Sequence, residues 1–87
     1  MTNVDDTLDE RGTKYGDYGE QAAIVERLIE TIRKSPNWDH MPATHRVALY
    51  LIALKIGRVC TGDVNYDDNW RDIAGYATLV EREINGQ

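Results

Sequence analysis

The sequence is poor in the residues on which disulfides, zinc sites and nucleic-acid coats depend. Its single cysteine, Cys60, cannot form an internal disulfide and fits a reducing compartment. With only His40 and His45 as further nitrogen ligands, a zinc site built from Cys and His is not expected. Ten basic and fifteen acidic residues give a net charge of −5, which argues against nonspecific nucleic-acid binding but leaves open an acidic inhibitor that mimics nucleic acid.

Long hydrophobic runs are also missing. The longest apolar stretch, Val47 to Leu54, is far shorter than the roughly 20 residues that span a bilayer. No charged-then-apolar signal opens the chain, so we expect a cytoplasmic protein with no membrane partner. The length of 87 residues supports one domain, which we expect over residues 11–87, after a flexible acidic arm over residues 1–10.

What the sequence does contain is helical periodicity, and it predicts an all-α fold. We expect a small bundle of three main helices at about residues 20–34, 42–60 and 67–84, with no strand and no internal repeat. The apolar stripe of the first helix is Ala22, Val25, Leu28, Ile29 and Ile32, and that of the third is Trp70, Ile73, Ala77, Val80 and Ile84.

Proline and glycine mark the ends of the second helix. Pro36 interrupts the first helical pattern, Pro42 suits a first helical turn, and Gly62 is expected to stop the second helix in a left-handed conformation. The segment from Val47 to Leu54 has no polar face, so this helix should be covered on several sides. Three short helices cannot easily cover it, and we expect a symmetric dimer in which the second helices pack across the axis. In the alternative, a monomer, the glycine-and-tyrosine loop and Trp38 cap the same surface.

Two cations and two carboxylates form the main candidate site. Lys55 and Arg58 lie three residues apart at the end of the second helix, and Asp68 and Asp72 lie four apart at the start of the third, so each pair shares a helical face. Paired carboxylates suit Mg²⁺, so Asp68 and Asp72 could be metal ligands, and Lys55 and Arg58 could hold phosphates. The structural alternative is that Asp68 caps its helix while Asp72 pairs with Lys55 or Arg58.

Other polar residues have plainer explanations. Glu26 and Glu30 could join the metal, although pairing with Arg33 and Lys34 on the outer face of the first helix is the simpler interpretation. Cys60 is expected to be a small buried thiol. His40 and His45 are expected to be surface or packing residues.

The loop around residues 11–19 could serve as a lid. Three glycines and two tyrosines would let Arg11 and Tyr15 fold toward the helix ends that carry Lys55 and Asp68, over an anionic ligand. An Arg11–Asp17 ion pair that merely pins the loop remains an equal alternative.

Several motifs carry a resemblance to known families. They are Glu10-Arg11-Gly12, Tyr15-Gly16-Asp17, Asn37-Trp38, Ala48-Leu49, Lys55-Ile56-Gly57-Arg58, Gly62-Asp63 and Trp70-Arg71-Asp72-Ile73-Ala74-Gly75-Tyr76-Ala77. From Leu8 to Glu83 the chain resembles a family of small phage and prophage proteins of uncharacterised function. The run from Lys55 to Ala77 is also similar to the core of the MazG-like, all-α nucleotide pyrophosphohydrolases.

The MazG-like resemblance implies an oligomeric helical protein that binds a nucleoside triphosphate with magnesium and releases pyrophosphate. It implies that Asp68 and Asp72 bind the metal, that Lys55 and Arg58 hold phosphates, and that Tyr15 or Tyr76 contacts the base or sugar. Arg11 joins the phosphate-binding residues only through the lid interpretation of the loop. The larger family carries an early Glu-x-x-Glu pair, whereas Glu26 and Glu30 are one residue too far apart. Catalytic residues therefore stay unassigned, because a site short of two carboxylates would bind without turnover.

A second hypothesis comes from a different class of protein. The acidic surface and the aromatic loop would also suit a non-catalytic interaction module that binds a host protein, such as an inhibitor of a defence or replication factor.

Overall fold

The described part of the chain folds as a row of three α-helices. The computed structural model describes residues 15–86, which form α2 (Tyr18–Arg33), the 3-10 turn η1 (Trp38–His40), α3 (Ala43–Thr61) and α4 (Asp67–Ile84). The all-α prediction is confirmed, with helix ends within two residues of those expected, and residues 15–86 contain no strand. The acidic arm over residues 1–10 lies outside the described range.

Local chemistry explains where the helices begin and end. The Asp17 carboxylate accepts a hydrogen bond from the backbone N–H of Glu20 at 2.9 Å, so α2 begins two residues before the predicted start. Pro42 directly precedes α3 and has no N–H to leave unpaired. The predicted left-handed stop at Gly62 is wrong, because its φ is −114°. Instead the Gly62 N–H donates to the Arg58 carbonyl at 2.9 Å and closes the last turn.

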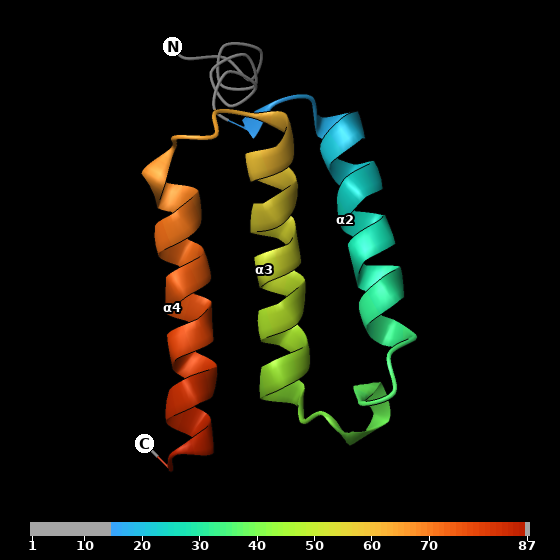
Figure 1. Cartoon of the computed structure of the whole chain (residues 1–87), viewed down its shortest axis with the longest axis vertical. Coiled ribbons are helices and arrows are strands. Elements are labelled where there is room, and N and C mark those ends of the chain that lie inside the picture. Colours follow the sequence, from blue (N-terminus) through green and yellow to red (C-terminus); the bar gives the residue numbers. More distant parts are fainter. Residues whose placement is uncertain (1–14, 87) are drawn as a thin grey trace, which may run out of the picture.

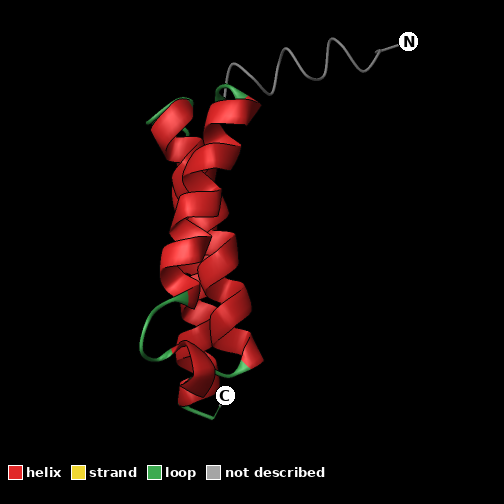
Figure 2. Cartoon of the chain, turned by 90° about the vertical axis from the view of Figure 1, so that its right-hand side faces the viewer, coloured by secondary structure: helices red, strands yellow, loops and turns green. Residues whose placement is uncertain are grey.

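The three helices lie side by side in one layer, with α3 in the middle (Figure 1). Helix α3 runs antiparallel to both neighbours and packs against each of them. Turned by 90°, the layer is seen edge-on, and the helices overlap in a narrow column (Figure 2). The central position of α3 matches its lack of a polar face, but the two broad faces of the layer carry no further helix within residues 15–86.

Close backbone approach joins α2 to α3. A Cβ on Gly57 would lie 2.6 Å from Cγ2 of Val25, so only glycine fits this contact. At the end of α3, the Thr61 hydroxyl donates to the Tyr15 carbonyl at 2.6 Å. Gly16, at φ +84°, takes a conformation that favours glycine and lies against Thr61. These contacts place the segment before α2 against the end of α3.

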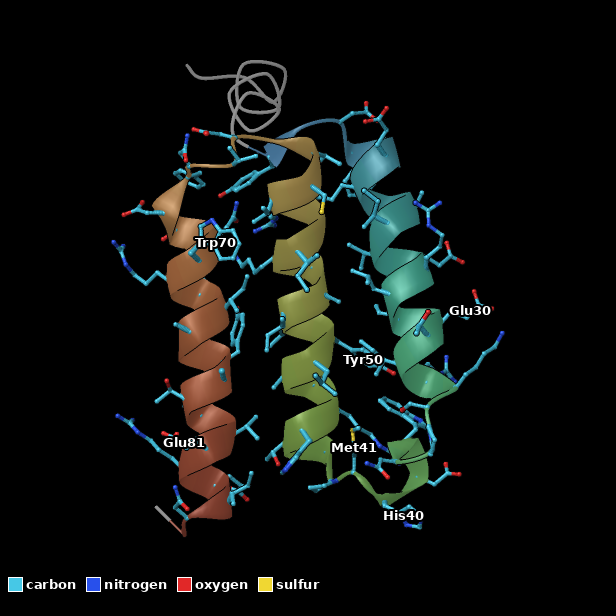
Figure 3. The ribbon with its side chains drawn as sticks, in the orientation of Figure 1. Glu30, His40, Met41, Tyr50, Trp70 and Glu81 are labelled. Atoms are coloured by element: carbon cyan, nitrogen blue, oxygen red, sulfur yellow. The ribbon has the colours of Figure 1, made fainter. Side chains whose placement is uncertain are left out.

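The far end of the α2–α3 pair is closed by η1. The Arg46 guanidinium donates to the Trp38 carbonyl at 2.7 Å and lies 4.5 Å from the centre of the Trp38 ring. Trp38 in turn packs on Tyr50, with 5.5 Å between ring centres. Figure 3 shows Tyr50 reaching from α3 toward α2, above this turn.

The core is small and corrects two predictions. Among residues 15–86, the only buried hydrophobic side chains are Ala48 and Ala53. Trp70 and Ile84, which the sequence placed on the buried stripe of the third helix, are 54% and 67% exposed. Cys60, expected to be buried, is exposed. No helix within residues 15–86 has the length and apolar character to cross a membrane.

Candidate functional site

Helices α2 and α4 begin, and α3 ends, at the same end of the layer (Figure 1), and polar residues lie near these three helix ends. We define the polar cluster as Gln21, Lys55, Arg58, Asn69 and Asp72. Because α3 and α4 are antiparallel, Lys55 near the end of α3 meets Asp72 near the start of α4, whereas Gln21 approaches α3 from α2, beside Gly57.

An ion pair joins α3 to α4 inside this cluster. Lys55 Nζ lies 2.7 Å from Asp72 Oδ2, and Lys55 is only 7% exposed, whereas the Asp72 side chain is 34% exposed. A buried ammonium group needs such a partner, because its desolvation is costly. Asp72 therefore has the pairing with Lys55 that the structural alternative predicted.

Arg58 stacks on an aromatic ring. Its guanidinium carbon lies 4.4 Å from the centre of the Tyr15 ring, a cation–π distance. The Tyr15 ring meets Tyr66 edge-on, with ring centres 5.7 Å apart. The buried Nε of Arg58 has no hydrogen-bond partner.

Two buried amides lie near this end of α3, one on α4 and one on α2. Asn69 is completely buried, and neither its Nδ2 nor its Oδ1 makes a hydrogen bond. Gln21, on the first turn of α2, is 6% exposed, and its Nε2 is also without a partner. Each unpaired buried polar group costs about 1–3 kcal/mol, so several of them in a small protein call for an explanation.

Tyr66 borders the cluster from the turn before α4. The pKa of its hydroxyl is raised above 10.0, first by the hydrogen bond with Tyr15, then by desolvation and by the negative charges of Asp68 and Asp67. A proton on Tyr66 is thus favoured in the folded protein.

The predicted metal ligands point to different partners. Asp68 Oδ1 lies 3.9 Å from Arg71 NH1, and Asp67 Oδ2 lies 3.0 Å from Arg71 NH2, all within the first turns of α4. Asp68 does not cap α4, because Tyr66 occupies that position. No group of three or more His, Cys, Asp or Glu side chains in residues 15–86 is placed to hold a metal ion.

The other predicted site residues are distributed as follows. Tyr15 lies at the polar cluster through its contact with Arg58, while Tyr76 is one helical turn beyond Asp72 and lines a groove between α3 and α4. Arg11 lies outside the described residues, so neither the lid nor the Arg11–Asp17 pair is tested.

Glu26 and Glu30 lie on the outer face of α2, which α3 separates from α4. Glu30 pairs with Lys34 at 2.7 Å, as the simpler interpretation predicted. Figure 3 shows Glu30 on the side of α2 away from α3. His40 is exposed in η1, and His45 is half-buried at the start of α3, so both are surface or packing residues.

Asn69 and Gln21 were missed by the reasoning from sequence. A signal for them exists: Gln21 continues the stripe of Val25 and Leu28, and Asn69 lies three residues before Asp72. A polar residue at a position where the helical period predicts burial is a candidate for internal hydrogen bonding.

The chain was compared with models of protein families. The model described as "Domain of unknown function (DUF6378)" matches residues 2–84, which includes all three helices and the polar cluster. No curated protein and no solved structure is significantly similar to the chain.

Proposed function

We propose that this chain, which belongs to the DUF6378 family, binds a nucleoside triphosphate at the polar cluster. The observation that carries the proposal is the set of four buried polar atoms without a partner: Gln21 Nε2, Arg58 Nε, and both amide atoms of Asn69. A ligand rich in hydrogen-bonding groups that reached Arg58 and Asn69 would satisfy three of them and would recover the free energy that their burial costs.

Each residue has a role that follows from its chemistry. Arg58 and Lys55 supply positive charge for phosphate oxygens, Arg58 through its planar guanidinium and Lys55 as a point charge held by Asp72. The Asn69 amide offers N–H donors beside a carbonyl acceptor, the complement of the pattern on a nucleobase edge. Tyr15, already stacked on Arg58, provides a flat surface beside the phosphates, and Tyr76 provides one farther along α4.

The resemblance to MazG-like enzymes would add magnesium and hydrolysis. The described residues do not fit a metal centre, because Asp72 is bound to Lys55, Asp68 faces Arg71, and residues 15–86 gather no larger ligand set. The proposal is therefore one of binding, and we derive no hydrolytic step.

Calorimetry against a panel of nucleoside triphosphates, with and without magnesium, tests this proposal. The informative variant is Asn69→Leu, and Asn65→Leu is the matched control, because Asn65 is exposed in the turn before α4. We expect the wild type and the control to bind and Asn69→Leu to lose at least tenfold in affinity. Its stability should be unchanged or higher, because it removes two unpaired buried groups.

Two results would contradict the proposal. If Asn69→Leu still binds with unchanged affinity, the ligand lies elsewhere on the protein. If no nucleotide gives heat of binding, the protein does not bind nucleoside triphosphates. The second result would favour the interaction module. That alternative is supported by the exposed pair Val64 and Trp70, 61% and 54% exposed, in which the Trp70 indole N–H donates to the Val64 carbonyl at 3.2 Å.

A further inference from the structure

An apolar groove runs along one broad face of the layer, between α3 and α4. It has a volume of about 690 Å³ and is lined mainly by small and apolar side chains from both helices. Val47 and Leu79, on its walls, are 52% and 61% exposed. Such exposed apolar surface is costly in a monomer and usually marks a binding surface.

A second groove, of about 290 Å³, lies between the same two helices on the opposite face. The two grooves share Ala48 and Val80, while Leu49 and Ile52 line only the second. Helical periodicity sends Val47 and Leu49 to opposite sides of α3. None of the apolar residues that line the second groove is both large and exposed, so the first groove has the greater need of cover.

We propose that a second copy of this chain packs on the first groove, so that α3 and α4 of two copies form a four-helix core around a two-fold axis. One copy has no large buried hydrophobic side chain within residues 15–86. Its radius of gyration, 15.0 Å, exceeds the about 12 Å of a compact domain of this length. A second layer would supply both the missing core and the missing thickness.

The area and the charge of this face fit a copy of itself. The molecule measures 45 × 28 × 24 Å, so a broad face can provide the about 800 Å² that each partner buries in a stable complex. The charged residues that line the groove are one cation, Arg82, and one anion, Glu83. Two copies can therefore meet there without net repulsion, although the chain as a whole carries a charge of −5.

The test is the mass of the full chain in solution, measured by sedimentation over a wide range of concentration. Leu79→Glu and Val47→Lys place a charge in the groove, and Val64→Glu is the control, because Val64 and Leu79 are both 61% exposed in one copy. We expect the wild type and Val64→Glu to be dimers and both groove variants to dissociate at least tenfold more readily.

Circular dichroism measures the helix content of each variant and distinguishes a variant that unfolds from one that stays folded and dissociates. If a groove variant unfolds while Val64→Glu stays folded, the result supports the proposal, because an exposed side chain of a monomer gives no reason for unfolding. A wild type that is monomeric at all concentrations would overturn it. Groove variants that remain dimers would also overturn it, since another face would then form the interface.

Discussion

Lys55 and Asp72 depend on each other unequally, because Lys55 is buried and Asp72 is one-third exposed. Asp72→Ala leaves an unpaired ammonium group in the interior, which we expect to cost about 1–3 kcal/mol, less than the loss for a fully buried pair. Lys55→Met keeps the apolar stem and leaves a carboxylate that water can reach, so its cost should stay below about 1 kcal/mol. Urea unfolding of both variants measures the difference.

The critical result is which of the two variants loses more free energy of unfolding. A larger loss of stability in Lys55→Met than in Asp72→Ala would mean that the Asp72 carboxylate, and not the Lys55 ammonium, depends on the pair. The exposed ion pair between Arg71 and Asp67 serves as the control, since its removal should change the stability by less than about 1 kcal/mol.

Tyr66 makes the stability of the folded protein depend on pH. Its pKa is raised above 10.0 in the folded protein, first by the hydrogen bond with Tyr15. Above pH 10 the folded state therefore binds more protons than the unfolded state. The contribution of Tyr66 to the free energy of unfolding is fully present below pH 10 and is lost as the pH rises through the pKa of Tyr66 in the folded state. Ultraviolet absorbance of tyrosinate, compared with that of a Tyr66→Phe variant, should show that Tyr66 titrates above pH 10.

Tyr15→Phe separates this cause from the others. Without the Tyr15 hydroxyl, the pKa of Tyr66 should fall toward its ordinary value, while Tyr50→Phe, far from the cluster, should leave it unchanged. A late titration that persists in Tyr15→Phe would assign the shift to desolvation and to the neighbouring aspartates instead.

The sequence could predict individual site residues only in part. The helical period placed Lys55 at the end of one helix and Asp72 at the start of the next, and their opposite charges predicted the contact that the structure shows. Whether Asp68 would turn toward that pair or toward Arg71 depends on the rotation of α4, which no local pattern sets. The burial of Asn69 has the same origin, since α4 turns Asn69 inward and leaves Trp70 half-exposed.

At the scale of the helix, two glycines provide a matched comparison. Alanine is about 1 kcal/mol better than glycine inside a helix. Gly57→Ala would place a Cβ 2.6 Å from Val25, whereas at Gly75 a Cβ would meet nothing within 4 Å. We expect Gly75→Ala to raise the free energy of unfolding by about 0.5–1 kcal/mol, and Gly57→Ala to lower it by about 1–2 kcal/mol through overpacking.

Thermal unfolding measures the change in stability of Gly57→Ala and Gly75→Ala. If Gly57→Ala were stabilising, α2 could move away from α3 without cost, and the close approach would not define the packing of these helices. The two variants differ in this contact more than in helix propensity, because both glycines lie inside a helix.

The helices themselves were predictable because their causes are local. Apolar residues at helical spacing, the prolines between α2 and α3, and the turn after Gly62 fixed three segments. The extra turn η1 was not predicted, since it depends on the contacts of Trp38 with Arg46 and Tyr50 from α3. Capping by Asp17 also extended α2 into a segment whose glycines suggested a loop.

For the whole molecule, the row of three helices decides what the surface must do. Helix α3 lacks a polar face, and the two neighbours cover only two of its sides. The sequence indicated a surplus of apolar surface but not its location, because the location depends on how α2 and α4 are placed around α3. The grooves beside Ala48 show that the surplus lies between α3 and α4.

A dimer built on the first groove predicts that the thermal midpoint rises with protein concentration. When folding is coupled to association, each tenfold increase in concentration favours the folded state by about 1.4 kcal/mol. For two chains of 87 residues that unfold together, the midpoint should shift by on the order of 4 °C. Calorimetric scans over a hundredfold range measure the shift, and Val64→Glu should reproduce it. A constant midpoint would show that one row of helices is stable by itself, without a partner over Val47 and Leu79.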